Sequence, residues 1–209
     1  MKILIVGATR GIGRQVLEQA LAAGHAVTAL VREARRLDAQ HERLKVVQGD
    51  ILDANSVALA MAGQEAVCCS LGVRLPWPRV TVFSEGTRNL LAAMKQAGVK
   101  RLVCVTGIGA GDSRGHGGFF YDAVFYPLVT RGIYVDKDRQ EALIRASDAE
   151  WIIVRPGFLT NGPLTGRYRA LTDLTGVTAG WISRADVAYF ILQELVAPTH
   201  ARQTPLLTY

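Results

Sequence analysis

The sequence predicts an α/β fold, a doubly wound parallel sheet in a single domain that covers residues 1–209. Three observations indicate it: short apolar runs, longer amphipathic stretches between them, and a glycine-rich turn directly after the first run. Nearly continuous apolar runs are typical of parallel strands that are covered on both faces. Their alternation with helices builds a parallel sheet with right-handed crossovers. With 209 residues, one domain is expected rather than two.

The elements follow from these patterns in chain order. Buried strands are predicted at Ile3–Val6, Ala26–Val31, Leu44–Val47, Ala66–Ser70, Arg101–Thr106 and Trp151–Val154. Amphipathic helices are predicted between and after them, at Gly11–Ala23, Ser56–Met61, Val80–Ala97, Val135–Ala146 and Arg184–Val196. Two of the helices are followed directly by a glycine, Gly24 and Gly98, which is typical of helix C-termini.

Composition excludes several classes of protein. Apolar residues make up 49% of the chain and charged residues 20%, which favours a sizeable core and excludes global disorder. No apolar run reaches the roughly 18 residues of a membrane span, and the run before Arg10 is too short for a secretory signal. Cys68, Cys69 and Cys104 lie inside apolar segments, so we expect free thiols and a cytoplasmic location. No metal site is expected.

The basic residues are dispersed. The 24 Lys and Arg residues outnumber the 18 Asp and Glu residues, giving a net charge of +6. They do not form the basic stripe with interleaved aromatic residues that a nucleic-acid interface requires, so most are expected to be solvated surface residues. The exception is a cluster formed by Arg32, Arg35 and Arg36.

One glycine-rich segment interrupts the regular pattern. Residues 107–118 contain six glycines and follow a predicted strand end, where open α/β sheets place their ligands. The apolar stretch Phe119–Val129 comes next. Residues around 107–130, together with 156–183, are therefore expected to form a small substrate or lid region. A surface connection followed by a core helix is an equally weighted alternative for 107–130.

The turn after the first strand has the pattern of a phosphate-binding loop. Strand Ile3–Val6 continues into Gly7-Ala8-Thr9-Arg10-Gly11-Ile12-Gly13, and a helix follows at once. Small residues let the backbone turn tightly and approach a pyrophosphate, and the helix N-terminus supplies free N–H groups and a positive dipole end. The strand–turn–helix context makes the motif a dinucleotide-binding one.

The end of the second strand favours NADP(H) over NAD(H). Units that bind NAD carry an acidic residue about 20 positions on, which accepts hydrogen bonds from the ribose, whereas an arginine suits a 2′-phosphate. Arg32 occupies this place, and Arg10, Arg35 and Arg36 lie close enough in sequence to reach the same phosphate. Glu33 is the only counter-signal.

Longer motifs resemble a known family. The turn GATRGIG, the strand end LVR, the segment VVQGDILD and the stretches SLGVR and SEGTRNLLAAMKQAGVKRLV resemble atypical short-chain dehydrogenases/reductases of the flavin reductase and biliverdin-IXβ reductase group. So do WIIVRPGFLTNGPLTGRY and ISRADVAYFILQEL near the C-terminus. The resemblance covers nearly the whole chain and implies a Rossmann-like fold with an NAD(P) cofactor.

The turn and the resemblance together imply a set of cofactor contacts spread over several strand ends. Asp50 and Ile51 are expected at the adenine, and Thr106 and the pair Gly157–Phe158 at the nicotinamide. The full expected set is Gly7, Thr9, Arg10, Gly11, Ile12, Gly13, Arg32, Arg35, Arg36, Asp50, Ile51, Leu71, Gly72, Arg74, Thr106, Gly157 and Phe158.

Some of these residues have a structural alternative. Asp50 also suits a turn or a helix N-cap, and Arg155 suits a pair with a core carboxylate. Five aromatic residues are candidates for an acceptor pocket or, equally, for the core: Trp77, Phe119, Phe120, Tyr121 and Tyr126.

The catalytic residues depart from the pattern of the superfamily. Classical members use a Tyr with a Lys four positions later, whereas here Lys137 follows Tyr134 by three and position 138 is Asp. Gly107 stands where related reductases carry a Ser. Thr106 and Lys137 remain as catalytic candidates, although an i,i+4 ion pair between Lys137 and Glu141 is favoured over a catalytic role.

The missing Tyr–Lys pair favours a planar acceptor. A flavin, quinone or tetrapyrrole can take hydride when it is stacked on the nicotinamide, with the proton coming from water. A ketone or alcohol needs a general acid, which makes an epimerase or ketone reductase a weaker hypothesis. We therefore expect an NADPH-dependent reductase of a small planar acceptor, acting as a monomer or weak homodimer without nucleic-acid or membrane partners. The alternative is a non-catalytic NADP(H)-binding sensor.

Overall fold

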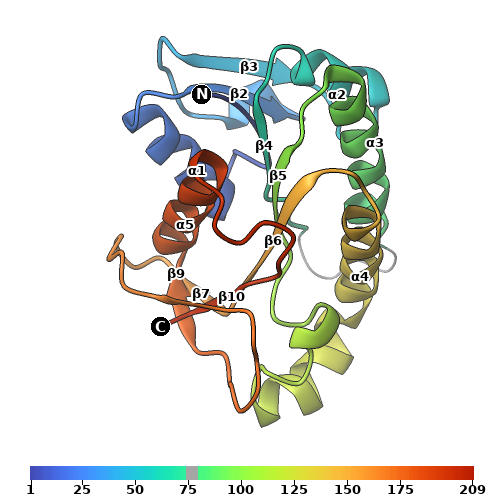
Figure 1. Cartoon of the computed structure of the whole chain (residues 1–209), viewed down its shortest axis with the longest axis vertical. Coiled ribbons are helices and arrows are strands. Elements are labelled where there is room, and N and C mark those ends of the chain that lie inside the picture. The colour runs from blue at the N-terminus through green and yellow to red at the C-terminus, as the bar shows by residue number, and fades with distance from the viewer. Residues whose placement is uncertain (74–79) are drawn as a thin grey trace.

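The computed structural model describes residues 1–73 and 80–209, and a parallel sheet forms its centre (Figure 1). The six predicted strands are confirmed as β1 (Lys2–Val6), β2 (Ala26–Val31), β3 (Leu44–Gln48), β4 (Ala66–Cys69), β5 (Arg101–Val105) and β6 (Glu150–Pro156). They lie side by side in the order β3-β2-β1-β4-β5-β6, and each pairs in parallel with its neighbours. The predicted fold class is thereby confirmed.

Four short strands were not predicted. β10 (Leu206–Thr208) extends the sheet in parallel beyond β6, and β8 (Arg169–Leu171) pairs with it in antiparallel orientation. β7 (Phe158–Thr160) and β9 (Trp181–Ser183) form a separate parallel pair. Each of these strands has only 3 residues, too few for an alternating pattern to stand out in the sequence.

Helices cover both faces of the sheet, as a doubly wound fold requires (Figure 1). One face carries α1 (Gly11–Ala22) and α5 (Arg184–Val196), which pack against each other. The other face carries α2 (Ala54–Met61), α3 (Val82–Ala97) and α4 (Arg131–Arg145). All five predicted helices are confirmed, although α4 begins earlier than expected, at Arg131. Gly98 ends α3 with φ +70°, in the left-handed conformation that a glycine tolerates best.

The neighbouring cysteines show how the sheet separates two cores. Cys68 points into the core beneath α1 and α5, whereas Cys69 points into the core beneath α2, α3 and α4. Successive side chains of a strand face opposite ways, which is why the two thiols cannot bridge. Cys104 is also buried and all three cysteines are free, as expected. The cytoplasmic location stays a prediction.

The segment 107–130 does not pack as a core helix. A short 3₁₀ turn (η2, Gly111–Ser113) and a π-helical segment (η3, Tyr121–Thr130) run into α4. Phe119 is 88% exposed and Leu128 is 79% exposed, so this part of the chain presents apolar side chains to solvent. The alternative of a core helix is therefore wrong. Within residues 1–73 and 80–209, no helix has both the length and the apolar character needed to cross a bilayer.

The turn between β1 and α1 depends on two close backbone contacts. A Cβ on Gly7 would lie 2.3 Å from the carbonyl oxygen of Ser70, and one on Gly13 would lie 2.2 Å from the carbonyl oxygen of Gly7. Gly11 is different, because its Cβ would have no neighbour closer than the side chain of Arg184 at 3.9 Å, although its φ is +61°. Gly7 and Gly13 thus let the turn, the helix and β4 approach one another.

These contacts predict unequal effects of two alanine substitutions. Gly13→Ala should lower the free energy of unfolding by about 3 kcal/mol, because the new methyl group meets backbone that cannot rotate away. Gly11→Ala should cost only about 1–2 kcal/mol, the strain of a left-handed residue with a side chain. Urea unfolding of both variants measures this difference, and equal losses would show that the turn is not constrained by packing.

Candidate active site

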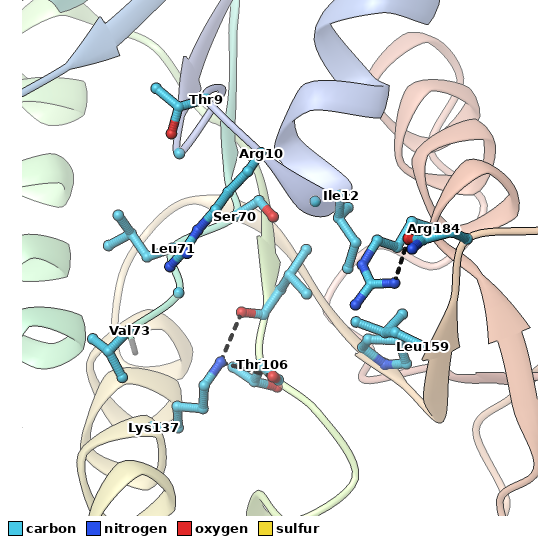
Figure 2. A pocket seen from close by; sticks show the side chains of 16 residues that line it. Thr9, Arg10, Ile12, Ser70, Leu71, Val73, Thr106, Lys137, Leu159 and Arg184 are labelled. Carbon is cyan, nitrogen blue, oxygen red and sulfur yellow. Dashed lines mark hydrogen bonds between the residues drawn. The ribbon is translucent and has the colours of Figure 1, made fainter. Parts of the chain in front are cut away.

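A cleft of about 570 Å³ opens at the carboxyl ends of β1, β4, β5 and β6 (Figure 2). It lies where the strand order reverses, between β1 and β4, which is where open α/β sheets bind ligands. Its lining residues are Gly7, Thr9, Arg10, Gly11, Ile12, Ser70, Leu71, Gly72, Val73, Val105, Thr106, Lys137, Pro156, Leu159, Asn161 and Arg184.

The glycine turn forms one wall of the cleft. Gly7, Thr9, Arg10, Gly11 and Ile12 all line it, and α1 begins there with no side chain capping its first N–H groups. Uncapped N–H groups and the positive end of the helix dipole are a ready anion site. The turn therefore fits the pyrophosphate of a dinucleotide, because its glycine backbone leaves room for the phosphates to approach.

The loop after β4 forms the facing wall. Ser70, Leu71, Gly72 and Val73 line the cleft here, and Arg10 extends toward Leu71 (Figure 2). The structure thus brings Leu71 and Gly72 to the cleft, as the resemblance implied. The predicted residues Arg74 and Trp77 lie outside the described residues.

Thr106 and Lys137 meet at the floor of the cleft, at the end of β5. The Lys137 ammonium group donates to the carbonyl oxygen of Thr106 at 2.7 Å and to that of Val105 at 3.4 Å. The Thr106 hydroxyl donates to Glu141 Oε1 at 2.8 Å. Burial lowers the pKa of Lys137 from its ordinary value. The favoured ion pair between Lys137 and Glu141 is wrong, because Lys137 turns toward the strand instead.

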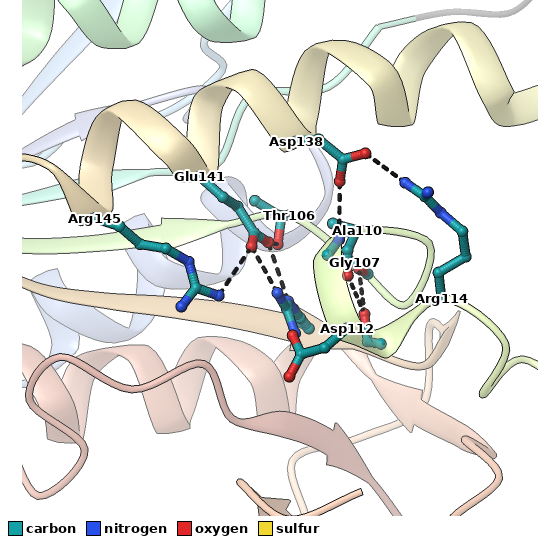
Figure 3. Close-up of polar contacts among 11 residues, drawn as sticks. Thr106, Gly107, Ala110, Asp112, Arg114, Asp138, Glu141 and Arg145 are labelled. Carbon is teal, nitrogen blue, oxygen red and sulfur yellow. Dashed lines mark hydrogen bonds and ion pairs between the residues drawn. The ribbon is translucent and has the colours of Figure 1, made fainter.

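The carboxylate of Glu141 belongs to a buried network beneath the floor (Figure 3). Arg155 is fully buried and donates to Glu141 from Nη2 at 2.6 Å and from Nε at 3.0 Å. Arg155 also pairs with Asp112, and Arg145 donates to Glu141 at 3.4 Å. Arg155 thus pairs with a core carboxylate, the role that its sequence context suggested. Removing one member of a buried ion pair typically costs about 3–5 kcal/mol.

Asp138 has a structural role where classical enzymes carry the catalytic lysine. Its carboxylate accepts a hydrogen bond from the backbone N–H of Gly111 at 2.8 Å and pairs with Arg114. The two contacts tie α4 to the loop that follows β5 (Figure 3). A lysine at this position would lose both.

Tyr134 packs against the glycines of the same loop. A Cβ on Gly107 would lie 2.7 Å from the Tyr134 hydroxyl, and one on Gly109 would lie 2.6 Å from its ring. The Tyr134 side chain therefore occupies the space that a side chain at position 107 would need, and a serine at position 107 would displace the phenol. Burial raises the pKa of Tyr134 well above its ordinary value, and the residue is not among those that line the cleft.

Other predicted residues are not among those that line the cleft. The Asp50 carboxylate accepts from the N–H of Leu52 at 3.0 Å, and Ile51 is buried in the core of the α3 face. A Cβ on Gly157 would lie 2.3 Å from the carbonyl oxygen of Gly180, so this glycine serves a close approach of two segments. The remaining members of this group are Gly13, Arg32, Arg35, Arg36 and Phe158.

The three arginines of the cluster after β2 are all exposed, and two of them form ion pairs. Glu33 pairs with Arg35 at 3.0 Å and with Arg36 at 2.9 Å, and the hydrogen bond from Arg35 contributes most to a lowered Glu33 pKa. Arg32 is exposed, and no ion pair of it occurs within residues 1–73 and 80–209. The acidic counter-signal Glu33 is therefore engaged by its own neighbours.

Sequence reasoning missed seven lining residues. Five of them extend strand ends that were already expected at the cleft: Ser70, Val73, Val105, Pro156 and Leu159. Asn161 and Arg184 follow β7 and β9, the short strands that carry no clear pattern. The signal that points to them is their place within the two C-terminal motifs, WIIVRPGFLTNG and ISRADV.

Comparison with known proteins agrees with this geometry. A family model described as NAD(P)H-binding matches residues 7–198. The anaerobilin reductase ChuY of Escherichia coli O157:H7 superposes with a TM-score of 0.84 at 27% identity, covering 100% of this chain and 97% of that one.

Curated sequences give the same result. An uncharacterized chloroplastic protein of Arabidopsis thaliana is 30% identical over 93% of this chain and 72% of its own length. The NAD(P)H azoreductase of Xenophilus azovorans is 26% identical over 96% of this chain and 65% of its own length. The expected NAD(P)-binding family is confirmed: the chain belongs to the NAD(P)H-binding family.

Proposed function

We propose that this NAD(P)H-dependent reductase passes hydride directly to a planar conjugated acceptor such as a flavin, a quinone or a tetrapyrrole. The bound cofactor supplies the hydride. One observation carries the proposal: the Thr106 hydroxyl donates its proton to Glu141, and the Lys137 ammonium group donates to the carbonyl oxygens of Thr106 and Val105. The Thr106 proton and two of the three Lys137 protons are thus held by the protein rather than offered to a substrate.

The kind of acceptor follows from the engagement of these two groups within the protein. A carbonyl substrate requires a general acid at its oxygen, and removing such an acid typically slows a reaction by about 100- to 10,000-fold. A conjugated ring can accept hydride and take its proton from water, so that the protein mainly aligns two rings. In this account, Thr106 and Lys137 position the end of β5.

An aromatic cluster beside the cleft supports a planar ligand. The Phe158 ring lies 5.3 Å from that of Tyr121 and 5.3 Å from that of Trp181. Phe158 lies between Pro156 and Leu159 in sequence, both of which line the cleft, and Trp181 is 61% exposed. Exposed aromatic faces of this kind stack on conjugated rings.

We further propose that residues 107–130 and 156–183 form one acceptor-binding region. Contacts between them support this. His116 Nδ1 is 2.8 Å from the carbonyl oxygen of Val177, and the backbone N–H of Ala179 donates to the carbonyl oxygen of His116 at 2.7 Å. Ile108 packs in a small apolar cluster with Leu174 and Ala179. The reductase activities in the names of two relatives, an azoreductase and an anaerobilin reductase, also support a reductive role for this region.

We propose that the preferred cofactor is NADPH. Arg32 stands exposed at the end of β2, where the ribose 2′ position of a bound dinucleotide is read. Glu33 would favour NAD(H) if its carboxylate were available to ribose hydroxyls, but Arg35 and Arg36 both engage it. The charge that faces a 2′-phosphate is therefore positive.

Reversing the charge at position 32 tests the preference. Arg32→Glu should weaken NADPH binding by roughly 10- to 100-fold, the loss of one charge-assisted hydrogen bond to phosphate. NADH binding should change far less, since it has no 2′-phosphate. Fluorescence titration of both cofactors measures the effect, with Arg88→Glu on the exposed side of α3 as a matched control. Equal losses for NADPH and NADH would refute the assignment.

Removing the Tyr134 hydroxyl tests the mechanism. Tyr134→Phe should leave the rate of flavin reduction within a few-fold of the parent, because the phenol packs under Gly107 and Gly109 and donates no proton to the acceptor. Stopped-flow NADPH oxidation with flavin mononucleotide provides the measurement. A loss of about 100-fold or more would restore an acid–base mechanism.

Tight NADPH binding without turnover of any flavin, quinone or tetrapyrrole would favour a non-catalytic sensor.

A further inference from the structure

Arg184 reaches the cofactor cleft from the C-terminal half of the chain (Figure 2). It is the first residue of α5, and its Nε lies 3.9 Å from the position that a Cβ on Gly11 would occupy. Its Nη1 donates to Asn161 Oδ1 at 2.8 Å, just beyond β7. The guanidinium group therefore lies between the first turn of α1 and the end of β7.

The electrostatic setting of Arg184 is unfavourable without an anion. A cation at the first residue of a helix opposes the positive end of that helix dipole. Arg184 faces a second positive end as well, because the uncapped N-terminus of α1 begins at Gly11. Within residues 1–73 and 80–209, its side chain donates to the neutral amide of Asn161 and forms no ion pair. The side chain is half-buried, so water screens these repulsions only in part.

The position of Arg184 identifies the anion. The helix start at Gly11 and Ile12 is the part of a dinucleotide-binding turn that receives the pyrophosphate. A guanidinium group offers several N–H donors in a planar fork that matches phosphate oxygens. We propose that Arg184 is a cofactor-binding residue whose guanidinium group binds the pyrophosphate, and that Asn161 orients it. The C-terminal half of the chain thereby contributes directly to holding the cofactor.

Two ligands separate this role from that of Arg32. NADP⁺ carries both a pyrophosphate and a 2′-phosphate, whereas adenosine 2′-monophosphate carries only the latter. Arg184→Gln should raise the Kd of NADP⁺ by roughly 10- to 100-fold and change that of adenosine 2′-monophosphate by less than about two-fold. Arg32→Glu should weaken both ligands. Calorimetric titration gives each Kd without any acceptor, so the result is independent of the proposed reaction.

Variants of Asn161 test the orienting contact. Asn161→Ala should weaken NADP⁺ by only a few-fold, because Arg184 stays in place but loses its hydrogen bond. Asn161→Asp should weaken NADP⁺ more, since the new carboxylate would pair with Arg184 and repel the pyrophosphate. Arg88→Gln on α3 serves as the control for loss of a surface charge, and thermal unfolding verifies that each variant is folded.

Two outcomes would overturn the proposal. One is an unchanged Kd for NADP⁺ in Arg184→Gln; if the KM for an anionic acceptor such as flavin mononucleotide rises at the same time, Arg184 belongs to the acceptor site. The other is an equal loss of affinity for NADP⁺ and adenosine 2′-monophosphate.

Discussion

The buried pair between Arg155 and Glu141 is the interaction on which the site depends. It joins β6 to α4 beneath the end of β5, and Arg155 has no exposed surface. Because two charges are costly to bury unless their hydrogen bonds are satisfied, the neighbours are arranged around them. Thr106 donates to Glu141, and Asp112 pairs with Arg155, which fixes the loop after β5. Gly111 has to be a glycine here, because its Cβ would lie 2.3 Å from Arg155 Nη2.

This arrangement leaves the cleft with two unlike halves. The half at the α1 N-terminus offers backbone N–H groups and the cations Arg10 and Arg184, which suits the phosphates of a dinucleotide. The half at the ends of β5 and β6 offers the apolar residues Val105, Pro156 and Leu159 beside Thr106 and Lys137, whose side chains donate to Glu141 and to the carbonyl oxygen of Thr106. The phosphate-binding turn and the floor thus come from separate elements, and the Arg155–Glu141 pair holds only the second of them.

Local patterns made most of the fold predictable, whereas tertiary contacts decided much of the site. The strands and the turn Gly7–Gly13 are continuous in sequence, so their apolar runs and glycines identify them directly. The partner of Lys137 was mispredicted because i,i+4 spacing describes an isolated helix, whereas the carbonyl oxygen of Thr106, directly after β5, accepts from the ammonium group instead. Asn161 and Arg184 were missed although they lie within recognisable motifs, because the approach of Arg184 to Gly11 and to Asn161 depends on how β7 and α5 pack.

The pH dependence of hydride transfer tests the central claim, that no side chain of the cleft protonates the acceptor. Stopped-flow oxidation of NADPH by flavin mononucleotide, at saturating concentrations and constant ionic strength, isolates the step from binding. The account predicts a nearly constant rate between about pH 6 and about pH 9, because no protein group has to change its protonation. The claim would be contradicted if the rate fell by an order of magnitude with pH in the manner of a single ionising group, and if Tyr134→Phe or Lys137→Met abolished this pH dependence.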